Sequence, residues 1–131
     1  VTGVQTCALP IYAIEDTIAH AASESAVDAG ARCIVAYTHS GNTAHNISKY
    51  HSPLPVFALT PREKTCRRLA LNWGVTSVQV PDSRNTDEMF VMAEKFMKEQ
   101  GYKSGDIVAI VAGVPLGVKG NTNMLKLHKL A

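Results

Sequence analysis

The sequence predicts an α/β protein: a three-layer α/β/α sandwich around a five-stranded, mostly parallel sheet whose last strand runs antiparallel. Two observations support this prediction. Short apolar runs rich in β-branched residues alternate with segments of helical period, a pattern typical of βαβ units and a parallel sheet. The last two apolar runs are joined by a glycine-rich loop, residues 112–122, that contains no helical pattern, and such a connection favours an antiparallel last strand.

The helices are expected where apolar residues recur every three or four positions, and three of the four end at a glycine. The clearest helix start is Thr60-Pro61-Arg62-Glu63, where threonine, proline and glutamate occupy the positions of a capping box. The helix that follows is expected to bury Leu69 and Trp73. The expected helices span residues 13–29, 43–49, 60–73 and 86–100.

The strands are expected where short apolar runs stand between turn residues. The first run, CIVAY, predicts a strand that is buried on both faces, because it has no polar position. The third run alternates apolar and polar residues. The expected strands span residues 33–37, 56–59, 75–80, 106–111 and 123–130.

Residues 1–12 do not continue this pattern. The string VTGVQTCALPI has neither helical nor strand period, and it back-translates in frame to a DNA string that resembles a common sequencing adapter. We therefore expect a non-native or disordered segment at 1–12 and a single domain at 13–131. On this interpretation the chain is a fragment of a longer protein, and Cys7 has no biological role.

The composition excludes several classes of function. The formal net charge is only +2 and no run of basic residues occurs, so we expect no nucleic-acid partner. No apolar stretch is long enough for a membrane span, and no secretory signal is recognisable. The three cysteines form neither a CxxC motif nor a cluster with histidine, so we expect reduced thiols, no metal site and a cytoplasmic location.

The strongest candidate site is the polar loop after the first strand. Ligands of open α/β sheets bind at the carboxyl ends of strands, and the free amides at a helix start suit a phosphate. The loop adds three hydroxyls, a glycine that admits close backbone approach, and His39, which carries charge when protonated. A polar turn that merely caps the helix is an equally good interpretation of the spacing. The candidate residues are Thr38, His39, Ser40, Gly41, Asn42 and Thr43.

A second candidate lies in the glycine-rich loop. Gly117, Lys119 and Gly120 would face the first loop if the first and fourth strands are neighbours. The glycines would supply flexible backbone and Lys119 a cation, although a plain turn is the better interpretation of the spacing alone. No catalytic constellation is expected, because no Ser/His/Asp order occurs and the paired carboxylates stand at helix starts, where they favour the helix dipole.

The chain carries IAHAA in its first helix, T-x-S-G-x-T-A from Thr38, RRLALNWGV from Arg67, and G-x-P-x-G-x-x-G-x-T-N from Gly113. In their order and spacing, these motifs resemble the C-terminal α/β domain of bacterial-type pyruvate kinases over residues 13–131. The resemblance implies the fold predicted above. It also implies a glycolytic parent enzyme that transfers a phosphoryl group between phosphoenolpyruvate and ADP, using magnesium and potassium in a catalytic (β/α)8 barrel.

None of that barrel's residues is present, so the fragment alone is expected to be inactive. In many members of the family this domain binds an activating sugar phosphate, such as fructose 1,6-bisphosphate, and it supplies a tetramer interface. The resemblance therefore implies an allosteric site at the two loops and a homotetrameric parent. Asn42 stands where many members have arginine or lysine, which weakens charge-assisted contacts to phosphate. Two alternatives are a stand-alone phosphate- or nucleotide-binding module of this fold, and a structural domain with an empty phosphate loop.

Overall fold

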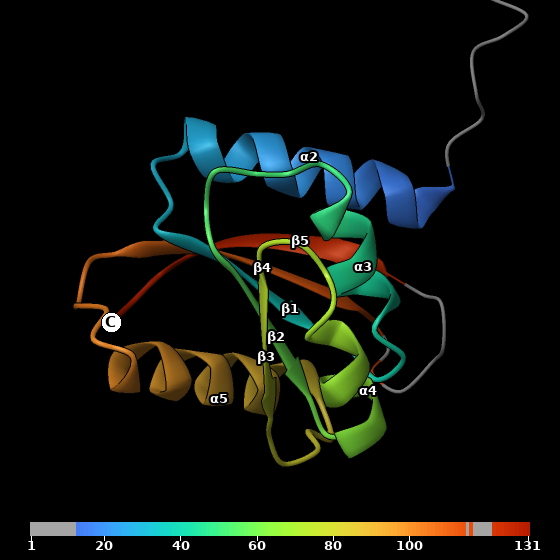
Figure 1. The fold of residues 1–131 in the computed structure, drawn as a ribbon. Coiled ribbons are helices and arrows are strands. Elements are labelled where there is room, and N and C mark those ends of the chain that lie inside the picture. Colours follow the sequence, from blue (N-terminus) through green and yellow to red (C-terminus); the bar gives the residue numbers. More distant parts are fainter. Residues whose placement is uncertain (1–12, 115, 117–121) are drawn as a thin grey trace, which may run out of the picture.

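The structure is a computed structural model that describes residues 13–114, 116 and 122–131. The segment 1–12, predicted to be non-native or disordered, lies outside the described residues. A five-stranded sheet forms the centre of the molecule (Figure 1), with the strand order β3-β2-β1-β4-β5. The strands are β1 (Cys33–Tyr37), β2 (Val56–Thr60), β3 (Val75–Gln79), β4 (Ile107–Gly113) and β5 (Thr122–Lys129).

The first four strands are parallel, and β5 pairs antiparallel with β4. Both parts of the predicted topology are confirmed. The order follows from the connections: crossover helices join β1 to β2, β2 to β3 and β3 to β4, whereas the sequence between β4 and its antiparallel neighbour carries no helical pattern.

Helices cover both faces of the sheet, which gives the predicted three layers. The helices are α2 (Ile14–Asp28), α3 (Asn42–Ser48), α4 (Glu63–Leu69) and α5 (Thr86–Glu99). One face packs on α2, α3 and α4, through a cluster that includes Ala22, Ile47 and Leu69. The other face packs on α5, through a cluster that includes Met89 and Met97. Figure 1 shows α2 and α5 on opposite sides of the sheet.

The central strand β1 is buried on both faces, as its sequence predicts. Ile34 and Ala36 belong to the cluster under α2 and α3, whereas Cys33, Val35 and Tyr37 belong to the cluster under α5. Alternate side chains of a strand point to opposite faces, so an entirely apolar run fits between two helical layers. The buried strand is the rigid base of the loop that follows it.

The predicted start of α4 is wrong. Thr60 ends β2 and is fully buried, and the helix begins at Glu63, after Arg62, whose side chain makes no capping hydrogen bond. The Thr60 Oγ1 accepts a hydrogen bond from the Arg62 N–H at 3.2 Å and so shapes the turn before the helix. The helix also ends earlier than predicted, so Trp73 is 54% exposed and stacks on the His51 ring at 4.3 Å between centroids.

Candidate functional site

The polar loop lies where the carboxyl ends of three parallel strands meet. It joins β1 to α3, and β1 is hydrogen-bonded in parallel to β2 on one side and β4 on the other. The condition for the two candidate loops to be neighbours is therefore met, because the first and fourth strands are adjacent. Thr43 Oγ1 and Thr122 Oγ1 lie 2.5 Å apart and tie the start of α3 to the start of β5.

Two of the loop's three hydroxyls accept hydrogen bonds that shape the turn. Thr38 Oγ1 accepts from the Gly41 N–H at 2.8 Å, and Ser40 Oγ accepts from the Asn42 N–H at 3.3 Å. A hydroxyl that accepts one bond still has a proton to donate. Thr38 and Thr43 are buried, however, whereas Ser40 is half-buried and Asn42 is exposed. Ser40 and Asn42 are therefore the more accessible side chains of the loop.

Gly41 is required by the backbone and by helix α4. Its φ of +93° lies in the left-handed region, which residues with a Cβ rarely adopt. A Cβ built at this position would lie 3.3 Å from side-chain carbons of both Leu69 and Thr65. The sequence suggested that Gly41 admits a ligand. The structure does not test that role, but it shows that the glycine also admits α4, which packs against the loop.

Helix α4 also holds the loop through polar contacts. Thr65 Oγ1 donates to the His39 carbonyl at 2.7 Å, and the Arg68 guanidinium donates to the Ser40 carbonyl at 2.7 Å. A hollow of about 680 Å³ over this helix is lined by four cationic side chains and one carboxylate. Its lining residues are Arg62, Glu63, Lys64, Thr65, Arg67 and Arg68.

The cations of α4 were not predicted as site residues. They belong to a different βα unit from the loop, and no local pattern relates the two segments. Arg68, whose guanidinium contacts the Ser40 carbonyl, provides positive charge beside the loop that Asn42 does not supply.

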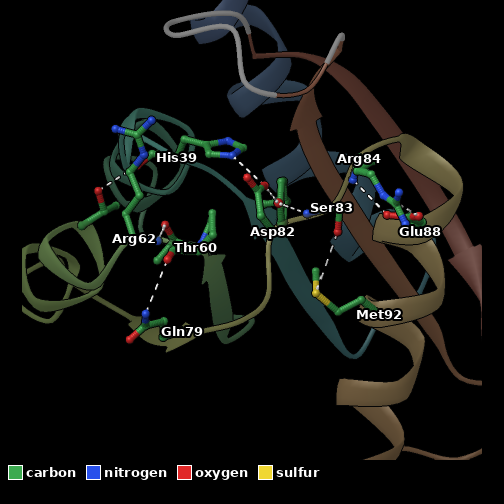
Figure 2. A network of polar contacts seen from close by, with 12 residues as sticks. His39, Thr60, Arg62, Gln79, Asp82, Ser83, Arg84, Glu88 and Met92 are labelled. Atoms are coloured by element: carbon green, nitrogen blue, oxygen red, sulfur yellow. Dashed lines mark hydrogen bonds and ion pairs between the residues drawn. The ribbon is translucent and has the colours of Figure 1, made fainter.

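His39 is hydrogen-bonded to a residue that the sequence analysis also missed. Its Nε2 lies 3.1 Å from Asp82 Oδ1, which also accepts a hydrogen bond from the Tyr37 hydroxyl at 3.1 Å. The Ser83 N–H in turn donates to that hydroxyl at 3.1 Å. Figure 2 shows the His39 ring and the Asp82 carboxylate pointing toward one another. The segment after β3 is thus tied both to the loop and to the end of β1.

These contacts shift two pKa values in the network. The hydrogen bond from His39 lowers the pKa of Asp82, so this carboxylate is ionised at neutral pH. Burial raises the pKa of the Tyr37 hydroxyl, which keeps its proton. Since an ionised carboxylate only accepts hydrogen bonds, the proton between His39 and Asp82 resides on the Nε2 of His39. The imidazole was expected to face a ligand, but one of its two nitrogens is already engaged.

Three predicted site residues, Gly117, Lys119 and Gly120, lie outside the described residues. The base of their loop is described. The Asn123 side chain accepts a hydrogen bond from the Val114 N–H at 2.8 Å and donates one to the Val114 carbonyl at 2.7 Å. Asn123 therefore holds the two ends of the glycine-rich loop together beside the β1 loop.

A second hollow, between β3 and α5, is less suited to an anion. Its volume is about 740 Å³, and its apolar wall includes Val80, Met92 and Phe96. The charged side chains at its rim are four carboxylates and one lysine: Asp82, Asp87, Glu88, Glu99 and Lys95. A phosphate would meet a net negative charge there, so the β1 loop is the better candidate.

No cluster of metal-ligating side chains is found in the part of the chain that the structure describes. No three His, Cys, Asp or Glu side chains there gather closely enough to hold a metal ion. Burial raises the pKa of the Cys33 thiol to about 11, which disfavours the nucleophilic thiolate. None of the described helices is both long and apolar enough to span a bilayer.

Comparison with known proteins decides the family. The family model described as "Pyruvate kinase, alpha/beta domain" matches residues 16–128. The chain belongs to the pyruvate kinase family. The predicted resemblance is thereby confirmed, and the match covers the polar loop, the α4 cations and Asp82.

Pyruvate kinases from two bacteria illustrate the relationship. The Lactobacillus delbrueckii subsp. bulgaricus enzyme is 44% identical over 116 residues, which are 88% of this chain and 20% of that protein. The Corynebacterium glutamicum enzyme is 40% identical over 114 residues, or 86% of this chain and 24% of that protein. The chain thus spans about a quarter or less of the length of these relatives.

A solved structure shares the fold as well. A structure described as Cryptosporidium parvum pyruvate kinase in complex with ADP superimposes with a TM-score of 0.83 and 29% sequence identity. The match covers 98% of this chain and 26% of that chain. The pyruvate kinase α/β domain is therefore the architecture of the whole described region.

Proposed function

We propose that this chain is the regulatory and oligomerisation domain of a pyruvate kinase and that its β1 loop binds the phosphate of a sugar-phosphate effector. The observation that carries the proposal is the position of the family's T-x-S-G-x-T-A motif. The motif lies at the carboxyl ends of adjacent parallel strands and beside the base of the second candidate loop. Ligands of open α/β sheets bind at such a position.

The chemistry of the loop suits a phosphate. The Ser40 hydroxyl and the Thr43 and Ala44 amides in the first turn of α3 are potential donors, and the Arg68 guanidinium lies 2.7 Å from the Ser40 carbonyl. The neighbouring α4 surface adds further cations. On this proposal Gly117, Lys119 and Gly120 contact the other end of the ligand. Fructose 1,6-bisphosphate, glucose 6-phosphate and ribose 5-phosphate are the candidate effectors.

The catalytic reaction belongs to the remainder of the parent protein. That protein is proposed to be a cytoplasmic glycolytic enzyme that transfers a phosphoryl group between phosphoenolpyruvate and ADP with magnesium and potassium. The described residues contain no cluster for such a metal, so this domain would act by binding and assembly rather than by chemistry.

The sheet offers a surface for assembly into the proposed homotetramer. Strand β5 lies at one edge of the sheet, spans Thr122–Lys129 and carries Leu127, which is 45% exposed. An edge strand presents backbone donors and acceptors to another chain. Native mass spectrometry of the chain tests this part of the proposal: a stable dimer or tetramer supports it, and a monomer at all concentrations contradicts it for the isolated domain.

Calorimetric titration with the three sugar phosphates tests ligand binding. Ser40→Ala removes a hydroxyl donor and should weaken binding by about 0.5–1.5 kcal/mol, while Asn42→Arg should strengthen it by adding a bidentate cation. Ser104→Ala and Gln100→Arg are matched controls, because these exposed residues precede β4 and lie near the amino ends of the parallel strands, opposite the β1 loop. If no form binds, Asn42→Arg included, the loop is a helix cap and the domain is structural.

A further inference from the structure

Asp82 places a negative charge beside a loop that is proposed to bind an anion. It lies in the connection between β3 and α5, and its side chain is 68% exposed. Two hydrogen bonds reach the same carboxylate oxygen, Oδ1, from His39 Nε2 and from the Tyr37 hydroxyl, each at 3.1 Å. The His39 side chain is only 16% exposed, so the ring is held between the loop and this carboxylate (Figure 2).

The position of the proton on His39 determines what the ring offers to a ligand. Its Nε2–H donates to Asp82, so in the neutral ring the other nitrogen, Nδ1, is only an acceptor. A phosphate consists of acceptors and needs donors. A bound phosphate can use the Nε2–H of His39 only if Asp82 gives it up. The hydrogen bond from His39 lowers the pKa of Asp82, which keeps the competing carboxylate charged.

The segment that carries Asp82 stays anchored when this contact breaks. The Ser83 N–H donates to the Tyr37 hydroxyl, and the Asn85 side chain accepts from the Glu88 N–H at the start of α5. When the exposed carboxylate turns away from His39, it also loses the Tyr37 hydroxyl, which donates to the same oxygen, while the other two contacts keep the segment in place.

We propose that Asp82 is an intramolecular competitor of the sugar phosphate: it occupies the Nε2–H donor of His39, and the ligand gains that donor only by displacing it. This inference rests on the proposed function, since it requires a phosphate at the β1 loop. It adds a regulatory residue to that site. Asp82 sets the ligand concentration at which the site fills, and ligand binding is coupled to the connection between β3 and α5.

Calorimetry on four variants tests the inference, with fructose 1,6-bisphosphate and glucose 6-phosphate as the ligands. Asp82→Ala removes the acceptor as well as the charge, and it should tighten binding about three- to fivefold, the size expected when one exposed charged contact no longer competes. Asp87→Ala is the matched control: it removes the same group from a nearby exposed residue that does not contact His39. Its affinity should stay close to that of the unaltered chain.

A double variant separates release of His39 from the simple loss of negative charge. In a His39→Ala background, Asp82→Ala should no longer tighten binding, because the donor it would release is gone. If Asp82→Ala binds no more tightly than Asp87→Ala, or tightens binding equally with and without His39, the inference is wrong while the proposed function stands. If no form binds either ligand, the proposed function fails and the inference with it.

Discussion

The substitution Gly41→Ala tests whether helix α4 determines the shape of the candidate loop. The glycine has φ +93°, and placing an L-residue in the left-handed region costs about 1–2 kcal/mol. Its new Cβ would also lie 3.3 Å from Leu69 Cδ2 and from Thr65 Cγ2. Overpacking a core contact costs about 1–3 kcal/mol, and the lower end applies because both neighbours are side-chain termini. The expected total loss of unfolding free energy is about 2–3 kcal/mol.

Gly105 provides a matched control for the backbone contribution. Its φ is +92°, almost the same as at Gly41, but a Cβ there would meet nothing within 4 Å. Gly105→Ala should therefore cost only the backbone part, about 1–2 kcal/mol. Urea unfolding followed by circular dichroism measures both variants, and an unchanged m-value is required for the comparison. Equal losses for the two variants would refute the claim that α4 packs against the loop at Gly41.

Three further predictions concern activity, the N-terminal segment and pH. The purified chain should not turn over phosphoenolpyruvate with ADP, and turnover above a mock preparation would show that catalytic groups are present after all. Removing residues 1–11, which lack any amphipathic period, should change the unfolding free energy by less than about 1 kcal/mol, as measured by urea unfolding. Hydrogen bonds from the Ala131 N–H and His128 lower the pKa of Glu94 in the folded chain. The ionised Glu94 therefore stabilises the fold at pH values above its pKa in the unfolded chain, about 4.3, and this contribution is lost as the pH falls through its lower pKa in the folded chain. Glu94→Gln should flatten the fall in stability below about pH 4.3, and an unchanged pH profile would contradict this assignment.

The sheet could be predicted closely because its strands are buried on both faces. The run at β1 has no polar position, and its predicted bounds match Cys33–Tyr37. The antiparallel β5 followed from the missing crossover helix. The start of α4 could not be predicted in the same way. Thr60-Pro61-Arg62-Glu63 has the local chemistry of a cap, but the burial of Thr60 at the end of β2 outweighs that preference.

The candidate site could be located from the sequence but not completed. The polar loop stands directly after an apolar strand, so its place at the sheet's carboxyl edge follows from the chain order. The residues that contact the loop from other elements do not follow from the chain order. Asp82 is 43 residues from His39, and Arg68 is 28 residues from Ser40. Such contacts depend on how β2 and β3 are placed beside β1, and no local period or motif encodes them.

The most direct test of the central claim is an amide NMR titration of the chain with fructose 1,6-bisphosphate. Saturable chemical-shift changes should appear at the amides of Ser40, Gly41 and Asn42. The amide resonances of Gly30 and Gly101, which precede β1 and β4 near the amino ends of the strands, should not change. An absence of shifts, or saturable shifts confined to the opposite edge, would contradict the account of this domain as a sugar-phosphate-binding regulatory module.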